Sequence, residues 1–351
     1  MPAKPRLPLT VGLGKHASLR ALIDGTVKPE GIDLTCITDV PEPWMMTLGE
    51  RLLNGQFDGS EFSTSYFTQH KLAGAPLVAI PVFPYRSFRH RCIFCHEGSG
   101  IRVPADLRGK RIGLHSYAAS TMTWVRGLLR DEYGILPQDI HWYSMEDLGT
   151  SGARASGVSI DFLPPAPDGI TQIEQIARMI ARGELDGGVS PTDLTRPGVR
   201  RLFANSSEVE AEYYRRTGIY PIIHSFVINE RIFRDHPWAP LSLLEACRKS
   251  AALTSRYVGD DDLERWDRDM WETDRQILGD RDPNSWGMGD GERRSIEAFW
   301  EYLILDGAIS SKPDLDTFYP PSIRTPLGSK RPESPLGDSM VVGGSLLMIG
   351  Q

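Results

Sequence analysis

The sequence predicts a two-lobed α/β protein with a ligand cleft between the lobes. Short apolar runs alternate with amphipathic helical patterns, which is typical of βαβ units around a mainly parallel sheet. The chain has 351 residues, more than one ordinary core accommodates, so we expect two units. A late apolar strand followed by helices suggests that the chain returns to its first lobe after building the second.

The first lobe is expected to begin with short strands, because brief apolar or alternating runs end at turn residues. These strands are predicted at residues 9–12, 32–38 and 77–82, and residues 57–58 should open another. A helix is predicted at 44–53, and residues 91–95 should leave the lobe. Each strand is short enough for one layer of a small sheet. A second lobe should therefore start after residue 95.

The second lobe is expected to open with a helical turn, a glycine stop and a strand over residues 106–113. A helix should start near residue 119, because Met122, Val125 and Leu129 fall on one helical face. The following elements are a Gly-, Ser- and Pro-rich loop at 149–169, an amphipathic helix at 173–180, and short strands at 185–189 and 201–203.

An apolar strand at residues 222–228 should carry the chain back, and helices follow it, marked by residues such as Phe299 and Trp300 on one face. We predict residues 1–95 plus 226–324 as lobe 1, 96–225 as lobe 2, and 325–351 as a C-terminal extension. Two segments would then cross between the lobes, and the ligand would bind between them.

Composition limits the partners. The net charge of −7 argues against nucleic acid and favours solubility. No apolar run has the length of a signal peptide or a membrane span, so we expect a cytoplasmic protein without a membrane partner. Trp266, Trp271 and Trp286 could form a homo-oligomer interface or pack in the core.

Cys92 and Cys95 form a C-x-x-C flanked by His90 and His96, which looks like half a zinc site. The run is strand-like, however, and positions three apart in a strand point to opposite faces. We therefore favour buried thiols and predict no metal site. Walker and Rossmann motifs are also missing, so we expect no cofactor, with a role for a divalent metal left open.

The basic and aromatic run at residues 85–91 is the sharpest local feature. Arginine forks match carboxylates, so Arg86, Arg89 and His90 are candidate anion-binding residues, and the aromatic rings could stack on a flat ligand. The alternative is a solvated basic hinge between the lobes.

Two strand-to-helix junctions carry small hydroxyl residues, which suit anion binding at a helix start. In the first, residues 113–121, His115 is a candidate for proton transfer, and Ser116 and Tyr117 are candidates for ligand binding. The alternative is that its hydroxyl residues only cap the helix.

The second junction spans residues 58–65 and contains Ser60, Glu61 and Ser63. Glu61 could act as a general acid or orient a histidine, and the serines could contact ligand. The alternative is that these residues only organise the turn. His16 and His224 are further candidates for catalysis, although a histidine in an apolar strand is often a core residue.

An ordered set of motifs resembles the 4,5-dihydroxyphthalate decarboxylase family. The motifs lie at residues 22–32, 57–61, 79–90, 124–127, 139–142, 183–186, 236–238 and 295–299. The resemblance implies the fold of type 2 periplasmic solute-binding proteins, which share the pattern at residues 106–113. It also implies decarboxylation of a small aromatic carboxylate substrate, an ortho-dicarboxylate that bears a catechol.

For this chemistry, His16, His115, His224 and Glu61 are our candidates for the proton transfers. Arg86 and Arg89 would hold the carboxylate that stays on the ring, and Tyr117 would contact a ring hydroxyl. The pair at residues 15–16 departs from the Tyr-Asp expected in relatives, which leaves another aromatic acid open as substrate. A non-catalytic solute-binding or sensor protein is the alternative function.

Overall fold

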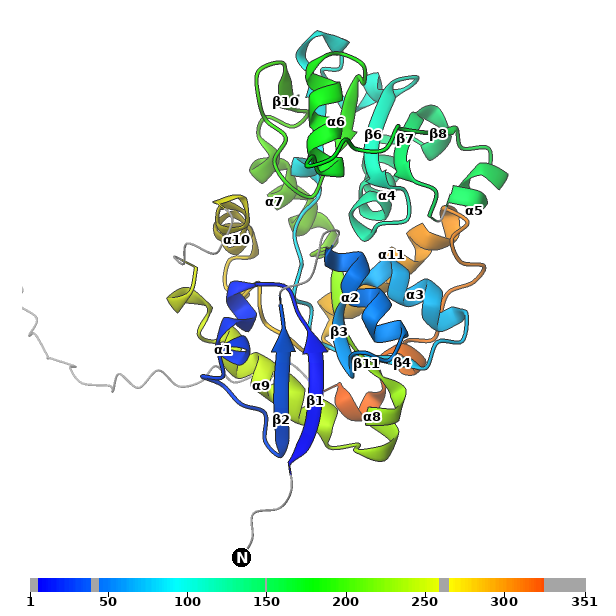
Figure 1. Ribbon diagram of the computed structural model, residues 1–351. Helices are drawn as coiled ribbons and strands as arrows, with labels where there is room; N and C mark the ends of the chain where they lie inside the picture. Colours follow the sequence, from blue (N-terminus) through cyan, green and yellow to red (C-terminus); the bar gives the residue numbers. More distant parts are fainter. Residues whose placement is uncertain (1–5, 39–43, 149, 259–264, 325–351) are drawn as a thin grey trace, which may run out of the picture.

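The computed structural model describes residues 6–38, 44–148, 150–258 and 265–324, and these residues form two lobes, each built on one β-sheet (Figure 1). The first sheet has the strand order β2-β1-β3-β11-β4. Its strands are β1 (Leu7–Gly12), β2 (Ile32–Ile37), β3 (Gly59–Ser63), β4 (Leu77–Ile80) and β11 (His224–Asn229). β1 runs parallel to β2 and β3, whereas β11 is antiparallel to β3 and β4.

The second sheet has the order β10-β5-β9-β6-β7-β8. Its strands are β5 (Ile93–His96), β6 (Arg111–Ser116), β7 (His141–Glu146), β8 (Ile160–Phe162), β9 (Gly187–Val189) and β10 (Val199–Arg201). β6 pairs in parallel with β7 and β9, whereas β5 is antiparallel to β9 and β10. In both sheets the antiparallel strands are those next to a lobe crossing.

Helices cover both sheets. Those around the first sheet are α1 (Arg20–Ile23), α2 (Trp44–Leu53), α3 (Thr64–Leu72), α8 (Glu230–Asp235), α9 (Ala239–Ala251), α11 (Asp290–Leu305) and α12 (Leu315–Phe318). Those of the second lobe are α4 (Ser120–Tyr133), α5 (Thr150–Ala155), α6 (Gln172–Ala181) and α7 (Ser206–Thr217). α10 (Arg265–Leu278) lies beside α7, where the two lobes meet (Figure 1).

The predicted α/β fold class is confirmed, but the strand expected at residues 201–203 forms at Val199–Arg201, and one loop prediction is wrong. The segment 149–169 was expected to be a loop, but α5 and β8 form inside it. The chain there buries Ala153, Val158 and Ile160, and β8 gains backbone hydrogen bonds as the edge strand beside β7. Tertiary contacts thus outweigh the turn-forming composition of this segment.

The chain crosses between the lobes twice, and the crossings lie side by side, because Arg86 and Ile222 form an isolated antiparallel bridge. β5 already belongs to the second sheet, and β11 begins at His224 in the first. The exact lobe boundaries at residues 95 and 225 stay predictions. The predicted C-terminal extension, residues 325–351, lies outside the described residues.

α4 fastens the second lobe to the first. Its Trp124 donates the indole N–H to the carbonyl of Ile222 at 2.9 Å, and its Arg126 pairs with Asp306 at the end of α11. At Gly127 a Cβ atom would lie 2.2 Å from the Tyr302 ring, so only glycine permits this approach of α4 to α11. The lobes are therefore joined along this side.

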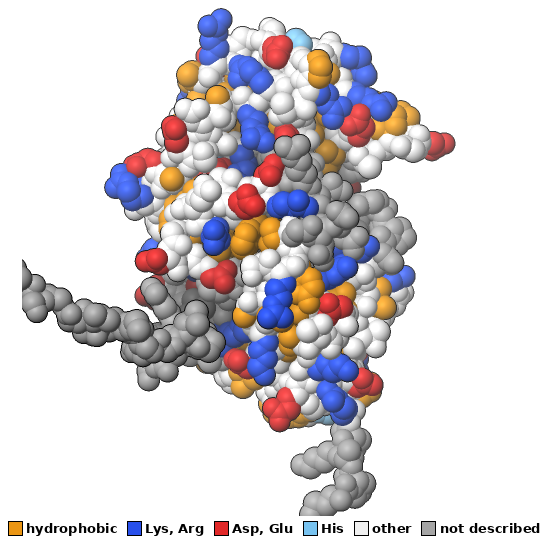
Figure 2. All heavy atoms as spheres, turned by 90° about the vertical axis from the view of Figure 1, so that its left-hand side faces the viewer, with side chains coloured by type: hydrophobic (Ala, Val, Ile, Leu, Met, Phe, Trp, Pro, Cys, Tyr) orange, Lys and Arg blue, Asp and Glu red, His pale blue; other side chains and the backbone are white. Residues whose placement is uncertain are grey.

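The surface carries charges of both signs. Figure 2 shows Lys, Arg, Asp and Glu side chains interspersed on one face rather than gathered in a basic patch. Among the described residues, no helix is long and apolar enough to cross a bilayer. The cytoplasmic location, the lack of a nucleic-acid partner and the homo-oligomeric state stay predictions.

Candidate active site

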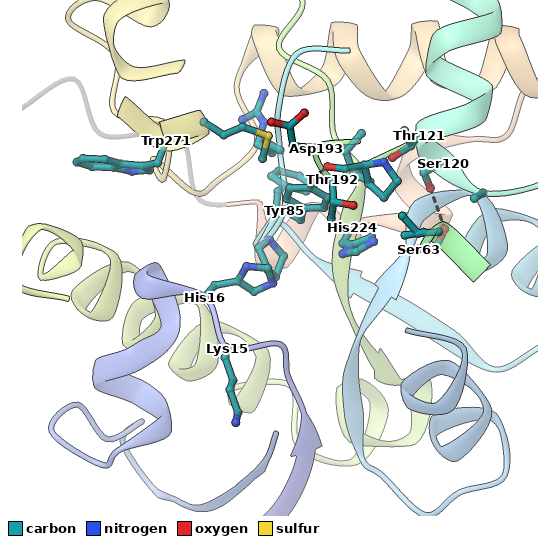
Figure 3. A pocket seen from close by; sticks show the side chains of 18 of the residues that line it. Lys15, His16, Ser63, Tyr85, Ser120, Thr121, Thr192, Asp193, His224 and Trp271 are labelled. Carbon is teal, nitrogen blue, oxygen red and sulfur yellow. Dashed lines mark hydrogen bonds between the residues drawn. The ribbon is translucent and has the colours of Figure 1, made fainter. Parts of the chain in front are cut away.

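A cavity of about 1300 Å³ lies between the lobes, and most of the predicted functional segments contribute to its wall. His16, Tyr85 and His224 line it from the first lobe and the crossing segment, whereas His115 and Thr121 line it from the second lobe. Figure 3 shows the two imidazoles of His16 and His224 on either side of the Tyr85 ring. The cavity therefore has the position expected of an interlobe ligand site.

The Glu61 carboxylate ties two histidines together at this wall. His224 donates from Nδ1 to Oε1 at 2.6 Å, and His16 donates from Nε2 to both oxygens at 2.9 Å. The backbone N–H of Gly14 donates to Oε2 at 2.9 Å. Glu61 is 0% exposed and does not line the cavity itself, so it positions the two imidazoles from behind.

The sheet register explains why these side chains meet. Glu61 lies on the central strand β3 and pairs with Phe226 of β11, so His224 is its diagonal neighbour across the strands. His16 comes from the loop after β1, which runs parallel to β3. Neighbouring strands thus bring one carboxylate and two imidazoles together near the strand ends that face the cavity.

Electrostatics fixes the protonation states at this cluster. Burial would raise the pKa of Glu61, but the charges and hydrogen bonds of His16 and His224 hold this pKa well below its usual range. Burial lowers the pKa of His224, and Glu61 opposes that shift only in part. His224 is therefore neutral at pH 7, with its proton on Nδ1, which donates to Glu61.

The serines predicted to bind ligand come from both lobes, and each of them hydrogen-bonds a protein group. Ser63 and Ser120 hydrogen-bond each other at 2.8 Å across the lobes, and Ser116 bonds the Tyr66 hydroxyl at 2.9 Å. Ser60 is 0% exposed and donates to the carbonyl of Glu61. Ser60 and Ser116 do not line the cavity, whereas Ser63 does. Their hydroxyls help to hold the cleft together.

His115 is the titratable group of the second lobe that lines the cavity with an unsatisfied ring nitrogen. Its Nδ1 is buried and finds no hydrogen-bond partner among the described residues. Burial lowers the pKa of His115 to about 4, so this imidazole is also neutral at pH 7.

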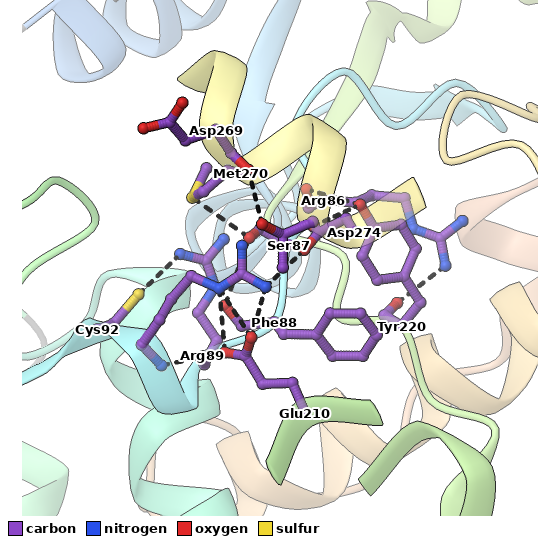
Figure 4. Close-up of polar contacts among 12 residues, drawn as sticks. Arg86, Ser87, Phe88, Arg89, Cys92, Glu210, Tyr220, Asp269, Met270 and Asp274 are labelled. Carbon is purple, nitrogen blue, oxygen red and sulfur yellow. Dashed lines mark hydrogen bonds and ion pairs between the residues drawn. The ribbon is translucent and has the colours of Figure 1, made fainter. Parts of the chain in front are cut away.

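The basic run is buried rather than solvated, which excludes the hinge exposed to water (Figure 4). Arg86 lines the cavity but donates to Glu292 at 2.7 Å and to the carbonyl of Tyr220 at 2.8 Å. Arg91 pairs with Glu210 and Asp274. The guanidinium groups of Arg86 and Arg91 are therefore already paired inside the protein.

Three further candidates lie behind the cavity wall. Arg89 is 1% exposed and packs against the Tyr85 ring. His90 is enclosed by aromatic rings, and Tyr117 lies under the guanidinium of Arg126, 3.7 Å from its ring centre. None of the three lines the cavity, so their predicted contacts with a ligand stay predictions without support from this geometry.

Sequence reasoning missed Tyr85 as an individual residue. Its ring stacks on His16 with centroids 6.2 Å apart and an angle of 21° between the planes, and it lies 5.2 Å from His224. The available signal was an aromatic residue directly after Pro84, at the point where the chain leaves the first sheet. Asp193 and Trp271, which also line the cavity, had no such signal.

The cysteines of the C-x-x-C motif, Cys92 and Cys95, are buried thiols outside any disulfide. Within the described ranges, no group of three or more His, Cys, Asp or Glu side chains is arranged to hold a metal ion. The expectation that no cofactor or metal takes part stays a prediction.

Replacing His90 with Phe should reduce the acid sensitivity of the fold. Burial, and then the charges of Arg91 and Arg216, lower the pKa of His90 to about 3, whereas in the unfolded chain it takes up a proton near pH 6.5. The unfolded state thus binds more protons, and stability falls as pH falls below 6.5, by about 1.4 kcal/mol per pH unit for this group. Urea unfolding at pH 7, 6 and 5 measures this slope.

The exposed His141 provides the control for that measurement, and His141→Gln should leave the slope unchanged. Equal slopes for wild type and His90→Phe would show that His90 is protonated in the folded protein.

No protein-family model matches the chain, but curated relatives and solved structures do. The chain is 30% identical over 308 residues to a 4,5-dihydroxyphthalate decarboxylase of Comamonas testosteroni, covering 83% of this chain and 89% of the relative. It is 30% identical over 218 residues to a 4,5-dihydroxyphthalate decarboxylase of Pseudomonas putida, covering 60% of this chain and 82% of the relative.

Two of the similar solved structures are sulphonate-binding proteins. The aliphatic sulphonate binding protein SsuA of Escherichia coli gives a TM-score of 0.55 at 14% identity, over 89% of this chain and 97% of its own. SsuA of Xanthomonas axonopodis pv. citri, bound to MOPS, gives 0.52 at 14% identity, over 87% and 94%. At such identities the likeness concerns the fold, and it confirms the expected type 2 periplasmic-binding-protein-like architecture.

Proposed function

This chain belongs to the 4,5-dihydroxyphthalate decarboxylase family, and from that premise we propose that it decarboxylates a dihydroxylated aromatic dicarboxylate such as 4,5-dihydroxyphthalate. The products would be 3,4-dihydroxybenzoate and CO₂. The observation that carries the proposal is the buried Glu61 carboxylate, which holds the imidazoles of His16 and His224 at the wall of the interlobe cavity.

The first step uses His224 as a general base. Its Nε2 takes the proton from the ring hydroxyl that lies para to the departing carboxylate. The electron pair of that oxygen then raises electron density at the carbon that carries the carboxylate. Glu61 stabilises the imidazolium that forms, because its charge lies 2.6 Å from Nδ1. A positioned base of this kind accelerates a reaction by about 10²–10⁴-fold.

In the second step a proton is added to that ring carbon, and the carbon–carboxylate bond breaks. Its electron pair returns to the ring, CO₂ leaves, and the product phenolate recovers the proton held by His224. One proton is consumed overall and replaces the carboxylate on the ring. His16, His115 and Tyr85 line the cavity and are the groups that could hand over this proton.

The cavity offers different environments for the two carboxylates. The start of α4, with Ser120 and Thr121 at the wall, presents backbone N–H groups and the positive end of a helix dipole to the carboxylate that stays. Phe83, Ile223 and Met270 form an apolar part of the wall. The departing carboxylate should face this apolar part, since neutral CO₂ is released more readily where no cation holds the anion.

The test is to incubate the purified protein with 4,5-dihydroxyphthalate and to measure CO₂ and 3,4-dihydroxybenzoate. We expect both in equal amounts. His224→Gln should lower kcat by at least about 10²-fold, because no neutral imidazole then faces the ring hydroxyl. The matched control His141→Gln changes an exposed histidine and should retain full turnover.

Bound but unconverted substrate would contradict the proposal and favour the binding or sensor protein. If the protein converted a different dihydroxylated aromatic acid and left 4,5-dihydroxyphthalate intact, the result would support decarboxylation but contradict the proposed substrate. Repeating the assay with a chelator tests the expected independence from metal.

A further inference from the structure

Tyr85 occupies the centre of the cluster at the cavity wall (Figure 3). Its ring stacks on His16 on one side and tilts at 57° to His224 on another. Its hydroxyl donates to the carbonyl of Pro191 across the cleft at 3.5 Å, the length of a weak hydrogen bond.

Arg89 lies behind this ring, with its guanidinium carbon 5.0 Å from the ring centre. The side chain is 1% exposed, and its Nη1 donates to Cys92 Sγ at 3.4 Å. Its Nε and Nη2 find no hydrogen-bond partner among the described residues. The group facing Arg89 from the cavity side is therefore the phenol of Tyr85.

The acids near Arg89 are engaged by other cations. Glu210 is bound by Arg91, and Asp274 is bound by Arg91 and by the Tyr220 hydroxyl (Figure 4). In the described part of the chain no carboxylate forms an ion pair with Arg89. Burying a cation without an anion is costly, so a transient anion beside Arg89 would be stabilised.

Three other groups at the cluster, Glu61, His115 and His224, are poor proton donors to a ring carbon. Glu61 carries no proton at neutral pH, because both histidines hold its pKa low, and it is sealed behind their rings. Burial holds the pKa of His115 at about 4, so this histidine is not an imidazolium at neutral pH. His224 is the base in the proposed first step.

We propose that Tyr85 is the acid that protonates the ring carbon bearing the departing carboxylate, and that Arg89 stabilises the phenolate this step leaves on Tyr85. The O–H bond of Tyr85 breaks, a C–H bond forms on the substrate ring, and the C–C bond to CO₂ then breaks. Tyr85 recovers its proton from water after CO₂ has left. Tyr85 is then a catalytic residue and Arg89 a positioning residue, an inference that rests on the proposed decarboxylation.

The direct test is Tyr85→Phe, assayed for turnover and for substrate affinity by calorimetry. We expect kcat to fall by about 10²–10⁴-fold while the dissociation constant changes little, because the phenyl ring preserves the packing against His16. Tyr143→Phe, a half-buried tyrosine of β7 outside the cavity wall, is the matched control. Turnover of Tyr85→Phe within threefold of wild type, or loss of affinity equal to the loss of kcat, would overturn the role.

The role of Arg89 is tested by pH. The acid role requires protonated Tyr85, so kcat should fall on the alkaline side where Tyr85 loses its proton. His16, His224 and the Pro191 carbonyl contact Tyr85 in every variant. The charge of Arg89 also lowers the pKa of His224, so Arg89→Met moves the acid limb as well, and only the alkaline limb reports Tyr85. Arg89→Met should move this limb up by about 1–3 pH units, and Arg89→Lys should move it less.

A readout without turnover separates this inference from the proposed function. The ultraviolet titration of Tyr85, taken as wild type minus Tyr85→Phe, should shift upward in the Arg89→Met background. If no CO₂ is produced by wild type, the proposed function and the acid role both fail, but a shifted titration still supports the Arg89–Tyr85 pair. An unshifted titration would overturn the part assigned to Arg89. Arg89→Met should fold, because the apolar side chain has a similar size and removes a buried charge that no carboxylate of the described residues pairs with.

Discussion

Glu61→Gln should abolish most of the turnover while leaving the substrate affinity nearly intact. The amide keeps the size of the carboxylate but loses the charge that fixes the Nδ1–H form of His224 and stabilises its imidazolium. We expect kcat to fall by about 10²–10⁴-fold, because a positioned base is removed. KM should change little, since Glu61 does not line the cavity. Steady-state kinetics with 4,5-dihydroxyphthalate measures both values.

The same variant should change the acid limb of the pH profile. Catalysis needs neutral His224, and its pKa is lowered by burial and partly restored by Glu61. Without the carboxylate that pKa falls further, so the remaining activity should persist to lower pH than in wild type. Glu212→Gln, an exposed glutamate on α7, is the control. An unchanged kcat in Glu61→Gln would remove Glu61 and its histidines from the mechanism.

Asp306→Ala should destabilise the protein by about 3–5 kcal/mol. Arg126 donates from Nε to both carboxylate oxygens at 3.1 Å, and it also bonds the Tyr117 carbonyl at 2.9 Å. Both partners are almost fully buried, with side-chain exposures of 2% and 6%. Removing the carboxylate leaves a guanidinium uncompensated at the contact of α4 with α11, which joins the lobes. Urea unfolding of the whole chain measures the loss.

Two further variants distinguish a lost ion pair from a lost side chain. Arg126→Met combined with Asp306→Leu should recover most of the stability, because an apolar pair of similar volume needs no desolvation of charge. Glu184→Ala removes the exposed partner of Arg182 and should have no measurable effect, since surface ion pairs contribute little. If Asp306→Ala lost no more unfolding free energy than Glu184→Ala, Arg126 would be exposed to water in the folded protein rather than buried.

The correctly predicted strands are those whose own sequence shows a short apolar run. Apolar runs at residues 9–12, 32–38, 77–82 and 222–228 each produced a strand, because such runs must be buried and are too short for helices. Residues 150–162 did not follow their Gly- and Ser-rich composition, because β8 gains its hydrogen bonds from β7, a partner that no local pattern reveals.

The basic run at residues 85–91 combines one feature that its sequence predicted with one that only tertiary contacts decided. Its place at a lobe crossing was readable from a strand closed by Pro84. The ion-pair partners of its arginines could not be predicted. Arg86 binds Glu292 and Arg91 binds Glu210, which lie 206 and 119 residues away in the sequence. These paired guanidinium groups hold the crossing in place, and a contact between Arg86 and a ligand stays a prediction.

The sequence by itself determined the two-lobed α/β class, the return of the chain to its first lobe and the residue types available for proton transfer, since these depend on local periodicity and composition. The tertiary structure decided which of those residues act together. His16 and His224 lie 45 and 163 residues from Glu61 in the chain, and only the register of β3 with β1 and β11 joins them. Burial and these neighbours then shift the pKa values of Glu61 and His224, because a pKa depends on desolvation and on groups that come together only in the folded chain.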